Sequence, residues 1–463
     1  MLFSSLEFLF GFLPLTLLVY YLFPPRLRNG VLLVFSLLFY GAGEPIFLWL
    51  MVLTVLADYG FGLWIERTAA RGRSPKPVLA FAVTAHVALL GFFKYYDLFA
   101  TSLGLPSLGI PLPIGISFYI FQALSYVIDV YRGEAAAQKN LVAFGTYVSL
   151  FPQLVAGPIV RYGEIDEQLT VRSHTASRAV SGISAFTVGL AKKVLFANSA
   201  GALCASLREM GRLNTALGVW LWLVSFAFQI YFDFSGYSDM AVGLGRMLGF
   251  ELPQNFRYPY VSQSITEFWR RWHMTLSGWF RTYVYIPLGG NRRGRGRTYL
   301  NLLVTWALTG LWHGAAWNFL LWGLYFFLLL VLEKTVLFRL LQKLPRAIRH
   351  GYALFFLLIG WLIFSADTMT WGDTLTLAGR LFGVGTTGVS DSIVRYELFR
   401  HLPIFALMGL GCTPLPRMLW ERCEKRIPRA AAWSRIPLCL TVWLLCIAYL
   451  VNSGYNPFLY FKF

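Results

Sequence analysis

The sequence predicts an all-α, polytopic integral membrane protein that crosses the bilayer about 11 times, with additional interfacial and re-entrant helices. Of its 463 residues, 57% are hydrophobic and only 13% are charged, whereas soluble domains carry about 25% charged residues. The mean hydropathy is +0.58. The apolar runs are long and unbroken, which favours membrane helices over the alternating strands of a membrane barrel.

The predicted helices follow the apolar runs of the chain in order. These runs cover residues 8–23, 31–43, 46–65, 78–99, 114–130, 141–155, 179–197, 216–232, 300–332, 352–364, 399–410 and 436–451. Spanning the hydrocarbon core takes roughly 20 residues, so we expect several of the shorter runs to be re-entrant or interfacial. No Gly/Ser-rich linker divides the chain. We therefore expect one integral membrane domain over residues 1–463.

Basic residues in short loops predict the orientation, because cytoplasmic loops are enriched in Lys and Arg. Arg26 and Arg28 follow the first run, and a basic loop over residues 67–76 follows the third. Both loops are cytoplasmic if the N-terminus lies outside. The run at 300–332 has basic residues on both flanks. We therefore expect either a broken helix at one flank or a segment that doubles back.

The net charge of +18 is also explained by basic cytoplasmic loops, because the Lys and Arg residues are spread over many short loops. That distribution argues against nucleic-acid binding. A second interpretation is attraction of an anionic acyl donor, such as coenzyme A or a phosphopantetheine carrier. The five cysteines form no C-x-x-C pair and have no nearby histidine. The sequence therefore indicates no metal site, and we expect the cysteines to be small buried hydrophobes.

His313 is the first candidate catalytic residue. It lies near the middle of the apolar run at 300–332, where a titratable ring is costly and usually faces protein or a water-filled cavity. On a continuous helix, Thr309 and Trp317 share its face. Gly310 and Gly314 would let another helix or a substrate chain approach closely. The alternative is a histidine that only hydrogen-bonds a neighbouring helix.

His273 is the second candidate, in an amphipathic helix predicted over residues 264–280. At 100° per residue, one face is apolar and the other is polar, and His273 lies at the boundary. The apolar face carries Phe268, Trp269, Trp272, Leu276, Trp279 and Phe280. Tryptophan is enriched at membrane interfaces. A helix that rests at the interface with a solvated charged face is therefore the alternative to a functional site.

Three further segments carry polar chemistry. Arg292, Arg293 and Arg295 lie in the Gly-rich turn at 287–297. They are candidates for contacting donor phosphates, although an ordinary positive-inside loop explains them equally. Asp233 and Asp239 are either partners of Arg side chains or part of a polar cavity. The Pro- and Gly-broken segment at 151–161 is expected to line an internal cavity.

Several ordered motifs occur along the chain, at residues 113–122, 151–161, 231–239, 269–273, 283–291, 311–314 and the terminal 456–463. Together they resemble those of one family, the membrane-bound O-acyltransferases. The most similar branch is that of the alginate O-acetyltransferases, with peptidoglycan O-acetyltransferases and the teichoic acid D-alanyl transferase nearby.

The resemblance implies a helical bundle with a central tunnel or funnel. It maps the family's near-invariant histidine onto His313 and a second motif position onto His273. It further implies an acyl thioester from the cytoplasm, acetyl-CoA first, as co-substrate and no bound cofactor. The implied acceptor is a hydroxyl of an extracytoplasmic polysaccharide such as alginate or peptidoglycan, with a periplasmic or extracellular acetyltransferase as partner. The implied location is the bacterial cytoplasmic membrane.

Acyl transfer to a hydroxyl needs a base to take the proton, and a desolvated, neutral histidine suits that role. We expect His313 to be the base. We expect His273, Asn318 or a tryptophan N–H to orient it or to stabilise the oxyanion. One alternative is D-alanyl transfer from a carrier-protein thioester. The other is a transporter for a lipid-linked sugar, suggested by the Gly- and Pro-broken membrane segments.

Overall fold

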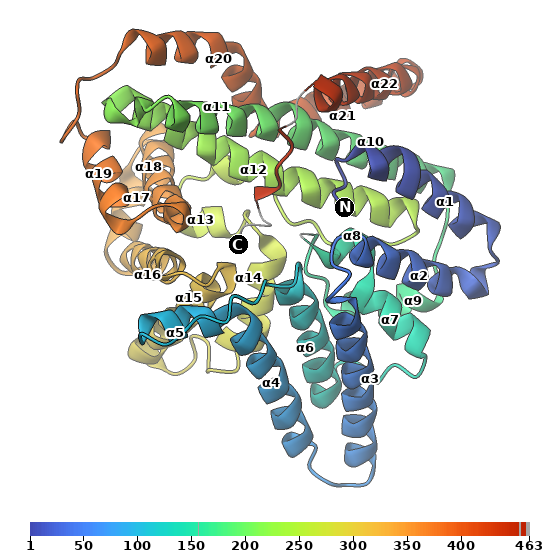
Figure 1. Cartoon of the computed structure of the whole chain (residues 1–463). Helices are drawn as coiled ribbons and strands as arrows, with labels where there is room; N and C mark the ends of the chain where they lie inside the picture. Colours follow the sequence, from blue (N-terminus) through green and yellow to red (C-terminus); the bar gives the residue numbers. More distant parts are fainter. Residues whose placement is uncertain (156, 453–454, 460–463) are drawn as a thin grey trace. The chain divides into compact units, whose positions relative to one another are not determined.

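A computed structural model describes residues 1–155, 157–452 and 455–459 (Figure 1). Within these ranges the secondary structure is helical, and no β-strand is present, so the predicted all-α class is confirmed. Ala156, inside the 151–161 motif, and residues 460–463, at the end of the terminal motif, lie outside the described residues.

The described chain separates into two compact units. Unit 1 comprises Met1–Val188 and Tyr237–Gln254, and unit 2 comprises Gly189–Gly236 and Asn255–Phe463. Two of the three boundaries fall inside helices, α10 (Ala176–Ala191) and α12 (Ala216–Met247), and the third, after Gln254, falls in the segment that follows α12. The expectation of one domain over residues 1–463 stays a prediction.

Unit 1 is built around the buried helix α6 (Ile116–Arg132), against which α3 (Leu48–Ala70) and α4 (Lys76–Leu90) pack. Gly62 of α3 is required there, because a Cβ atom at this position would overlap the ring of Tyr126. The other helices of this unit are α1 (Leu13–Leu22), α2 (Arg28–Gly41), α5 (Tyr96–Ser102), α7 (Leu141–Ser149), α8 (Phe151–Leu154) and α9 (Asp166–Thr170).

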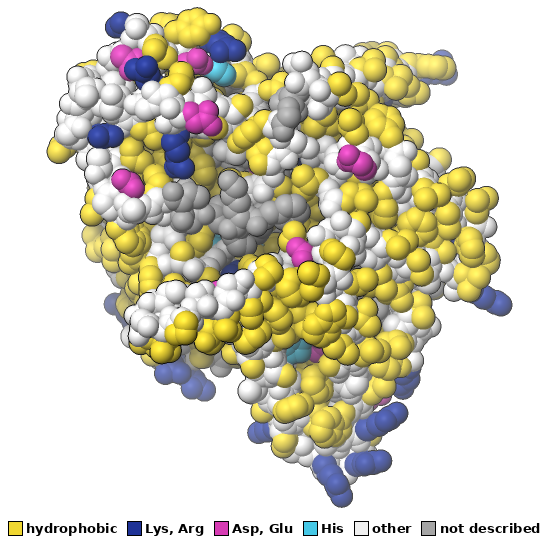
Figure 2. Space-filling model, viewed as in Figure 1, with side chains coloured by type: hydrophobic (Ala, Val, Ile, Leu, Met, Phe, Trp, Pro, Cys, Tyr) yellow, Lys and Arg dark blue, Asp and Glu magenta, His cyan; other side chains and the backbone are white. Residues whose placement is uncertain are grey.

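The outer faces of α3 and α4 are apolar, and the tip of their hairpin is basic (Figure 2). Trp49, Trp64 and Phe81 are among the exposed hydrophobic side chains of these helices. The exposed basic residues at the tip are Arg67, Arg71, Arg73 and Lys76. An apolar surface that ends in a basic loop is typical of a membrane helix with a cytoplasmic end. The orientation predicted from the sequence stays a prediction.

Unit 2 contains most of α12 and the helices that follow it. They are α13 (Ile265–Trp269), α14 (Met274–Phe280), α15 (Gly294–His313), α16 (Trp317–Leu332), α17 (Phe338–Lys343), α18 (Arg346–Phe364), α19 (Trp371–Leu381), α20 (Ser392–Gly411), α21 (Leu415–Arg426) and α22 (Pro428–Asn452). Helix α11 (Asn198–Glu209) precedes α12 in this unit.

Seven helices of the described chain are long and apolar enough to cross a membrane, or up to 8 if the bent pair α20 and α21 forms one span. The predicted number of about 11 crossings is therefore not confirmed. The difference arises because several apolar runs form short helices. Helices α2, α6 and α7 have 14, 17 and 9 residues, fewer than the roughly 20 residues that a span requires.

The apolar run at 300–332 is a helical hairpin rather than one helix. Helix α15 ends at His313, the chain turns at Gly314–Ala316, and α16 packs back against α15. Gly310 and Gly323 make the close approach possible, because a Cβ atom on either would overlap a backbone carbonyl of the opposite helix. The segment thus doubles back, as one of the two sequence expectations proposed.

The hairpin explains why both flanks of this run are basic. Because α15 and α16 are antiparallel, the turn at 292–297 and the segment at 334–349 lie at the same end of the hairpin. A single cytoplasmic location then satisfies the positive-inside rule for both.

Candidate active site

The prediction of one continuous amphipathic helix over 264–280 is wrong, because the helix breaks at His273. Helix α13 ends at Trp269, and α14 starts at Met274. His273 itself has φ 44° and ψ 54°, a left-handed conformation. For a non-glycine residue this costs on the order of 1–3 kcal/mol and persists only where the surroundings enforce it. Strain of this kind is concentrated at functional sites.

Asn255 enforces the break. Its backbone carbonyl accepts a hydrogen bond from the Met274 amide at 2.9 Å, and its Oδ1 accepts from the Thr275 amide at 3.3 Å. These are two of the first amides of α14, which have no partner within their own helix. Periodicity could not reveal this arrangement, because the capping residue lies in a different segment of the chain.

Asn255 also determines which nitrogen of His273 carries hydrogen. Its Oδ1 lies 3.1 Å from Nδ1 of His273 and accepts from the Thr275 hydroxyl at 3.0 Å. A backbone amide can only donate, so the Asn255 atom that faces the Thr275 amide must be the oxygen. Nδ1 of His273 therefore donates to Oδ1. In the neutral ring, Nε2 is then left with a lone pair.

Nε2 of His273 is buried and has no hydrogen-bond partner among the described residues. The residue is 1% exposed. Phe234 packs edge-on against the imidazole, with ring centroids 4.7 Å apart. Burial lowers the pKa of His273 well below its ordinary value, and the neighbouring His313 lowers it further. The ring is thus neutral near pH 7 and presents an unoccupied acceptor.

His313 lies at the C-terminus of α15, not in the middle of a helix as the sequence suggested. The residue is 5% exposed. Trp322 and Phe364 pack edge-on against its imidazole, with centroids at 4.9 and 5.5 Å. Trp317 does not share its face, as a continuous helix would require, because Trp317 starts α16 and is 45% exposed.

Trp312 brings the two histidines together. Its indole centroid lies 5.8 Å from the His273 ring and 5.1 Å from the His313 ring. Two candidates 40 positions apart in the sequence thus share one aromatic neighbour in unit 2. The sequence predicted both histidines as candidates but not the tryptophan between them.

Their contacts distinguish two of the polar neighbours that the sequence proposed for His313, Asn318 and a tryptophan N–H. Asn318 donates its side-chain amide to the carbonyls of Phe364 at 3.1 Å and Ile363 at 3.4 Å. That amide is thus engaged at the end of α18. Trp322, by contrast, has a buried Nε1–H without a hydrogen-bond partner among the described residues. Its ring contacts His313, with centroids 4.9 Å apart, so Trp322 is a candidate hydrogen-bond donor beside that histidine.

The other sequence candidates differ in their surroundings. Arg292, Arg293 and Arg295 are exposed, and among the described residues their side chains make no hydrogen bond or ion pair. Asp233 pairs with Lys193 at 2.7 Å rather than with an arginine, and its other oxygen accepts from the Leu459 amide at 2.7 Å. Asp233 therefore anchors the C-terminal segment, whereas the predicted cavity wall at 151–161 stays a prediction.

No group of His, Cys, Asp and Glu side chains in the described part of the chain could hold a metal ion. Cys204, Cys412 and Cys446 are buried, as expected. Cys423 on α21 is exposed and Cys439 on α22 is intermediate, so the expectation is wrong for these two.

Comparison with known proteins places this site in a family. A sequence profile of the membrane-bound O-acyltransferase family matches residues 38–369, which include both histidines and Asn255. The chain belongs to this family.

Three relatives illustrate the range within the membrane-bound O-acyltransferases. A "Probable alginate O-acetylase" of Azotobacter vinelandii is 43% identical over 404 residues, covering 84% of this chain and 80% of its own. A "Peptidoglycan O-acetyltransferase" of Helicobacter pylori is 34% identical over 362 residues, covering 70% and 68%. A "Teichoic acid D-alanyltransferase" of Bacillus subtilis is 29% identical over 222 residues, covering 46% and 56%.

This membrane-bound O-acyltransferase is therefore an enzyme and an integral membrane protein. The alternative of a transporter without acyl-transfer activity is wrong. The greater identity to the alginate and peptidoglycan relatives than to the D-alanyl transferase agrees with the branch that the motifs indicated.

Proposed function

We propose that this enzyme moves an acetyl group from cytoplasmic acetyl-CoA toward hydroxyls of an extracytoplasmic polysaccharide. Alginate and peptidoglycan are the acceptors that the relatives' names suggest. The location is the bacterial cytoplasmic membrane, and a periplasmic or extracellular acetyltransferase is the partner that completes transfer. The observation that carries the proposal is the pair of buried histidines joined by Trp312 in a chain of this family.

In the proposed reaction, His313 is the general base. The acceptor hydroxyl attacks the thioester carbonyl, a C–O bond forms, and the hydroxyl proton moves to the imidazole of His313. The tetrahedral intermediate collapses, the C–S bond breaks, and the proton passes from the imidazolium to the departing thiolate. Base catalysis of this kind typically contributes about 10²–10⁴-fold.

His273 supports the same step as a fixed hydrogen-bond acceptor. Because Asn255 holds the hydrogen on Nδ1, the lone pair on Nε2 is available to an O–H or N–H group of a reactant. Trp322 is the proposed donor to the developing oxyanion, since its Nε1–H has no partner among the described residues. A preorganised donor at such a position contributes on the order of 10²–10³-fold.

The test is transfer of label from acetyl-labelled acetyl-CoA to a hydroxyl acceptor by the purified protein. His313→Ala should lower the rate by about 10²–10⁴-fold, at a protein level equal to wild type. His401→Ala is the matched control, because His401 lies on α20 and contacts Glu397 rather than the site. Undiminished transfer by His313→Ala would refute the assignment of the base.

The second candidate function is D-alanyl transfer from a carrier-protein thioester, which the Bacillus subtilis relative's name suggests. A competition assay that offers acetyl-CoA and a D-alanyl carrier together separates the two. Acetyl-CoA consumption that is unaffected by the charged carrier supports acetyl transfer, whereas exclusive use of the carrier supports the second candidate.

A further inference from the structure

Glu333 is a nearly fully buried carboxylate that the two-histidine site leaves unexplained. It directly follows α16 and is 4% exposed. Among the described residues it forms no ion pair. A buried carboxylate is costly unless hydrogen-bond donors replace the water that it loses. The donors that meet Glu333 therefore indicate which part of the chain it holds.

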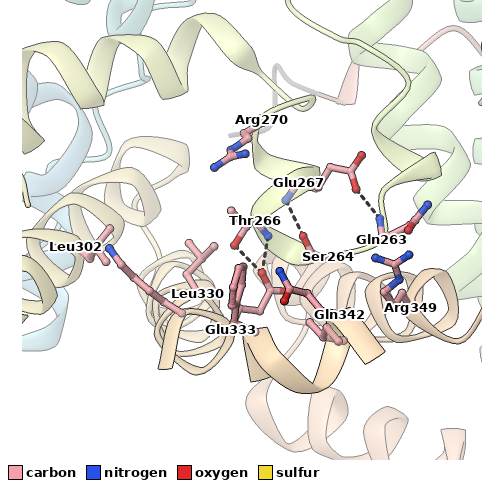
Figure 3. Close-up of a pocket in the computed structure, with 13 residues that line it drawn as sticks. Gln263, Ser264, Thr266, Glu267, Arg270, Leu302, Leu330, Glu333, Gln342 and Arg349 are labelled. Atoms are coloured by element: carbon pink, nitrogen blue, oxygen red, sulfur yellow. Dashed lines mark hydrogen bonds between the residues drawn. The ribbon is translucent and has the colours of Figure 1, made fainter. Parts of the chain in front are cut away.

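Three hydrogen bonds join Glu333 to the start of α13. Its Oε1 accepts from the Ile265 amide at 2.6 Å. Its Oε2 accepts from the Thr266 amide at 2.8 Å and from the Thr266 hydroxyl at 2.5 Å, and Figure 3 shows these two bonds. The first amides of a helix have no partner within it and favour a negative charge. Glu333 thus caps α13 from another helix.

Helix α13 depends on its surroundings for its direction. It has 5 residues, and so short a helix is not stable on its own. A second cap lies within the same turn, because Oγ of Ser264 accepts from the Glu267 amide at 3.0 Å. That bond orders the turn but attaches it to no other element. The bonds to Glu333 do attach it.

The other end of α13 also rests on α16. Trp269, its last residue, packs edge-on against Phe326 and Trp322, with ring centroids 4.9 and 5.4 Å apart. Trp322, Phe326 and Glu333 are 4 and 7 positions apart, a spacing that places them on one face of a helix. One face of α16 and its continuation therefore holds α13 at both ends.

This attachment connects the two parts of the site. The α15–α16 hairpin carries His313 and Trp312, together with Trp322. Helix α13 leads to His273, with only three residues between its end and that histidine. Because Glu333 belongs to the chain of the hairpin and caps α13, its carboxylate is a direct hydrogen-bonded link between the elements that carry the two histidines.

We propose that Glu333 is a positioning residue for acyl transfer, which fixes α13 on α16 and thereby holds His273 beside Trp312. This rests on the proposed function, in which His273 is a hydrogen-bond acceptor for a reactant. Without the carboxylate, the Ile265 and Thr266 amides lose their acceptor, and α13 can shift on α16. A displacement of about 1 Å at a reacting group can lower a rate by on the order of 10²-fold.

The first experiment is a double-mutant cycle, measured as acetyl transfer by the purified full-length protein. Glu333→Gln keeps the size of the side chain but turns an N–H₂ group toward a backbone amide that also donates. It should lower kcat by about tenfold or more, with KM changed much less. In a His273→Ala background, the same substitution should change kcat by less than about twofold, because the group that it positions is gone. Equal losses in both backgrounds would overturn the proposal.

Ser264→Ala is the matched comparison, because it removes the other cap of α13 but not the attachment to α16. Its unfolding midpoint should fall, while kcat should stay within about twofold of wild type. A loss of kcat equal to that of Glu333→Gln would show that any weakened cap suffices, against the proposal. Thr266→Val is the milder second variant, since it removes only the hydroxyl donor. It should lower kcat by a smaller factor than Glu333→Gln, and this loss should also disappear in the His273→Ala background.

A chemical measurement tests the position of His273 without using activity. Diethyl pyrocarbonate modifies neutral, accessible imidazoles, and mass spectrometry locates the modified residue. His273 is 1% exposed and should be protected in wild type but modified faster in Glu333→Gln. His86 of α4, in unit 1, is 4% exposed and pairs with Asp58. It should stay protected in both proteins, which would exclude general unfolding as the cause.

These outcomes separate the positioning role from the proposed function. If wild type transfers no acetyl group but Glu333→Gln exposes His273, the proposed function fails and the positioning role stands. If wild type transfers acetyl groups while folded Glu333→Gln changes neither kcat nor the modification of His273, the positioning role fails and the function stands.

Discussion

Nδ1 of His273 lies 3.1 Å from Oδ1 of Asn255, and the Thr275 amide fixes that oxygen from the other side at 3.3 Å. The contact has two consequences. It holds His273 in a left-handed conformation between two short helices. It also leaves the lone pair on Nε2, a buried atom that has no hydrogen-bond partner among the described residues.

Replacing Asn255 tests this relationship through the pH profile of acetyl transfer. In Asn255→Asp, the carboxylate still accepts from Nδ1–H, but its negative charge favours the imidazolium and raises the pKa of His273. The neutral fraction at a given pH falls, so the acid limb of the profile should move to higher pH while the rate above pH 8 stays near that of wild type.

Asn255→Ala is the companion variant. It removes the acceptor, so the rate should fall by about tenfold or more at every pH, without a shift of the acid limb. A purely structural Asn255 would instead give two variants that lose activity in parallel with unchanged limbs. That result would contradict the assigned tautomer.

The indole N–H of Trp322 is predicted to stabilise the oxyanion. Trp322→Phe keeps an aromatic ring against His313 but removes the donor, so kcat should fall by about 10²–10³-fold with KM changed much less. The comparison is Trp433→Phe, at an exposed position on α22, which should leave both constants unchanged. A loss confined to KM would show that Trp322 binds substrate rather than the transition state.

The close packing of the α15–α16 hairpin predicts that Gly310→Ala destabilises the protein. The added Cβ atom would overlap the carbonyl oxygen of Phe319, and overpacking of this kind costs about 1–3 kcal/mol. Thermal unfolding in detergent measures the change. Gly351→Ala on α18 is the matched control, because a Cβ there meets nothing within 4 Å. The unfolding midpoint of Gly351→Ala should equal or exceed that of wild type, since alanine favours helix more than glycine does. Equal midpoints for Gly310→Ala and Gly351→Ala would contradict the close packing of the hairpin.

The buried ion pair between Lys193 and Asp233 is predicted to contribute strongly to the stability of the protein. The Lys193 side chain is 2% exposed, and Asp233→Ala removes the carboxylate that pairs with it. Leaving a buried charge unpaired typically lowers the stability by about 3–5 kcal/mol. The variant should also expose residues 455–459 to carboxypeptidase, because the Leu459 amide loses its acceptor. The exposed pair of Arg417 and Glu421 on α21 is the comparison. Arg417→Ala should cost about 0–1 kcal/mol, and equal losses from the two variants would show that burial is not decisive.

The class of the protein and its two histidines could be read from the sequence, because both depend on local chemistry. Long apolar runs require helices in a bilayer, whatever surrounds them. A histidine within such a run is costly enough to single out His313, and ordered motifs identified the family.

The arrangement of the site could not be read in this way. Helical periodicity treats residues 264–280 and 300–332 as continuous helices, whereas the chain breaks at His273 and turns after His313. Both breaks are set by partners elsewhere in the chain: Asn255, 18 positions before His273, and the glycines that let α16 fold back on α15.

The sequence by itself determined that this chain is a helical membrane enzyme of a known family with His273 and His313 as candidates. Only the tertiary structure decided that Trp312 contacts both rings and that Asn255 sets the tautomer of one of them. The physical reason is that burial propensity is encoded locally, whereas hydrogen-bond direction and charge neutralisation depend on which distant groups meet.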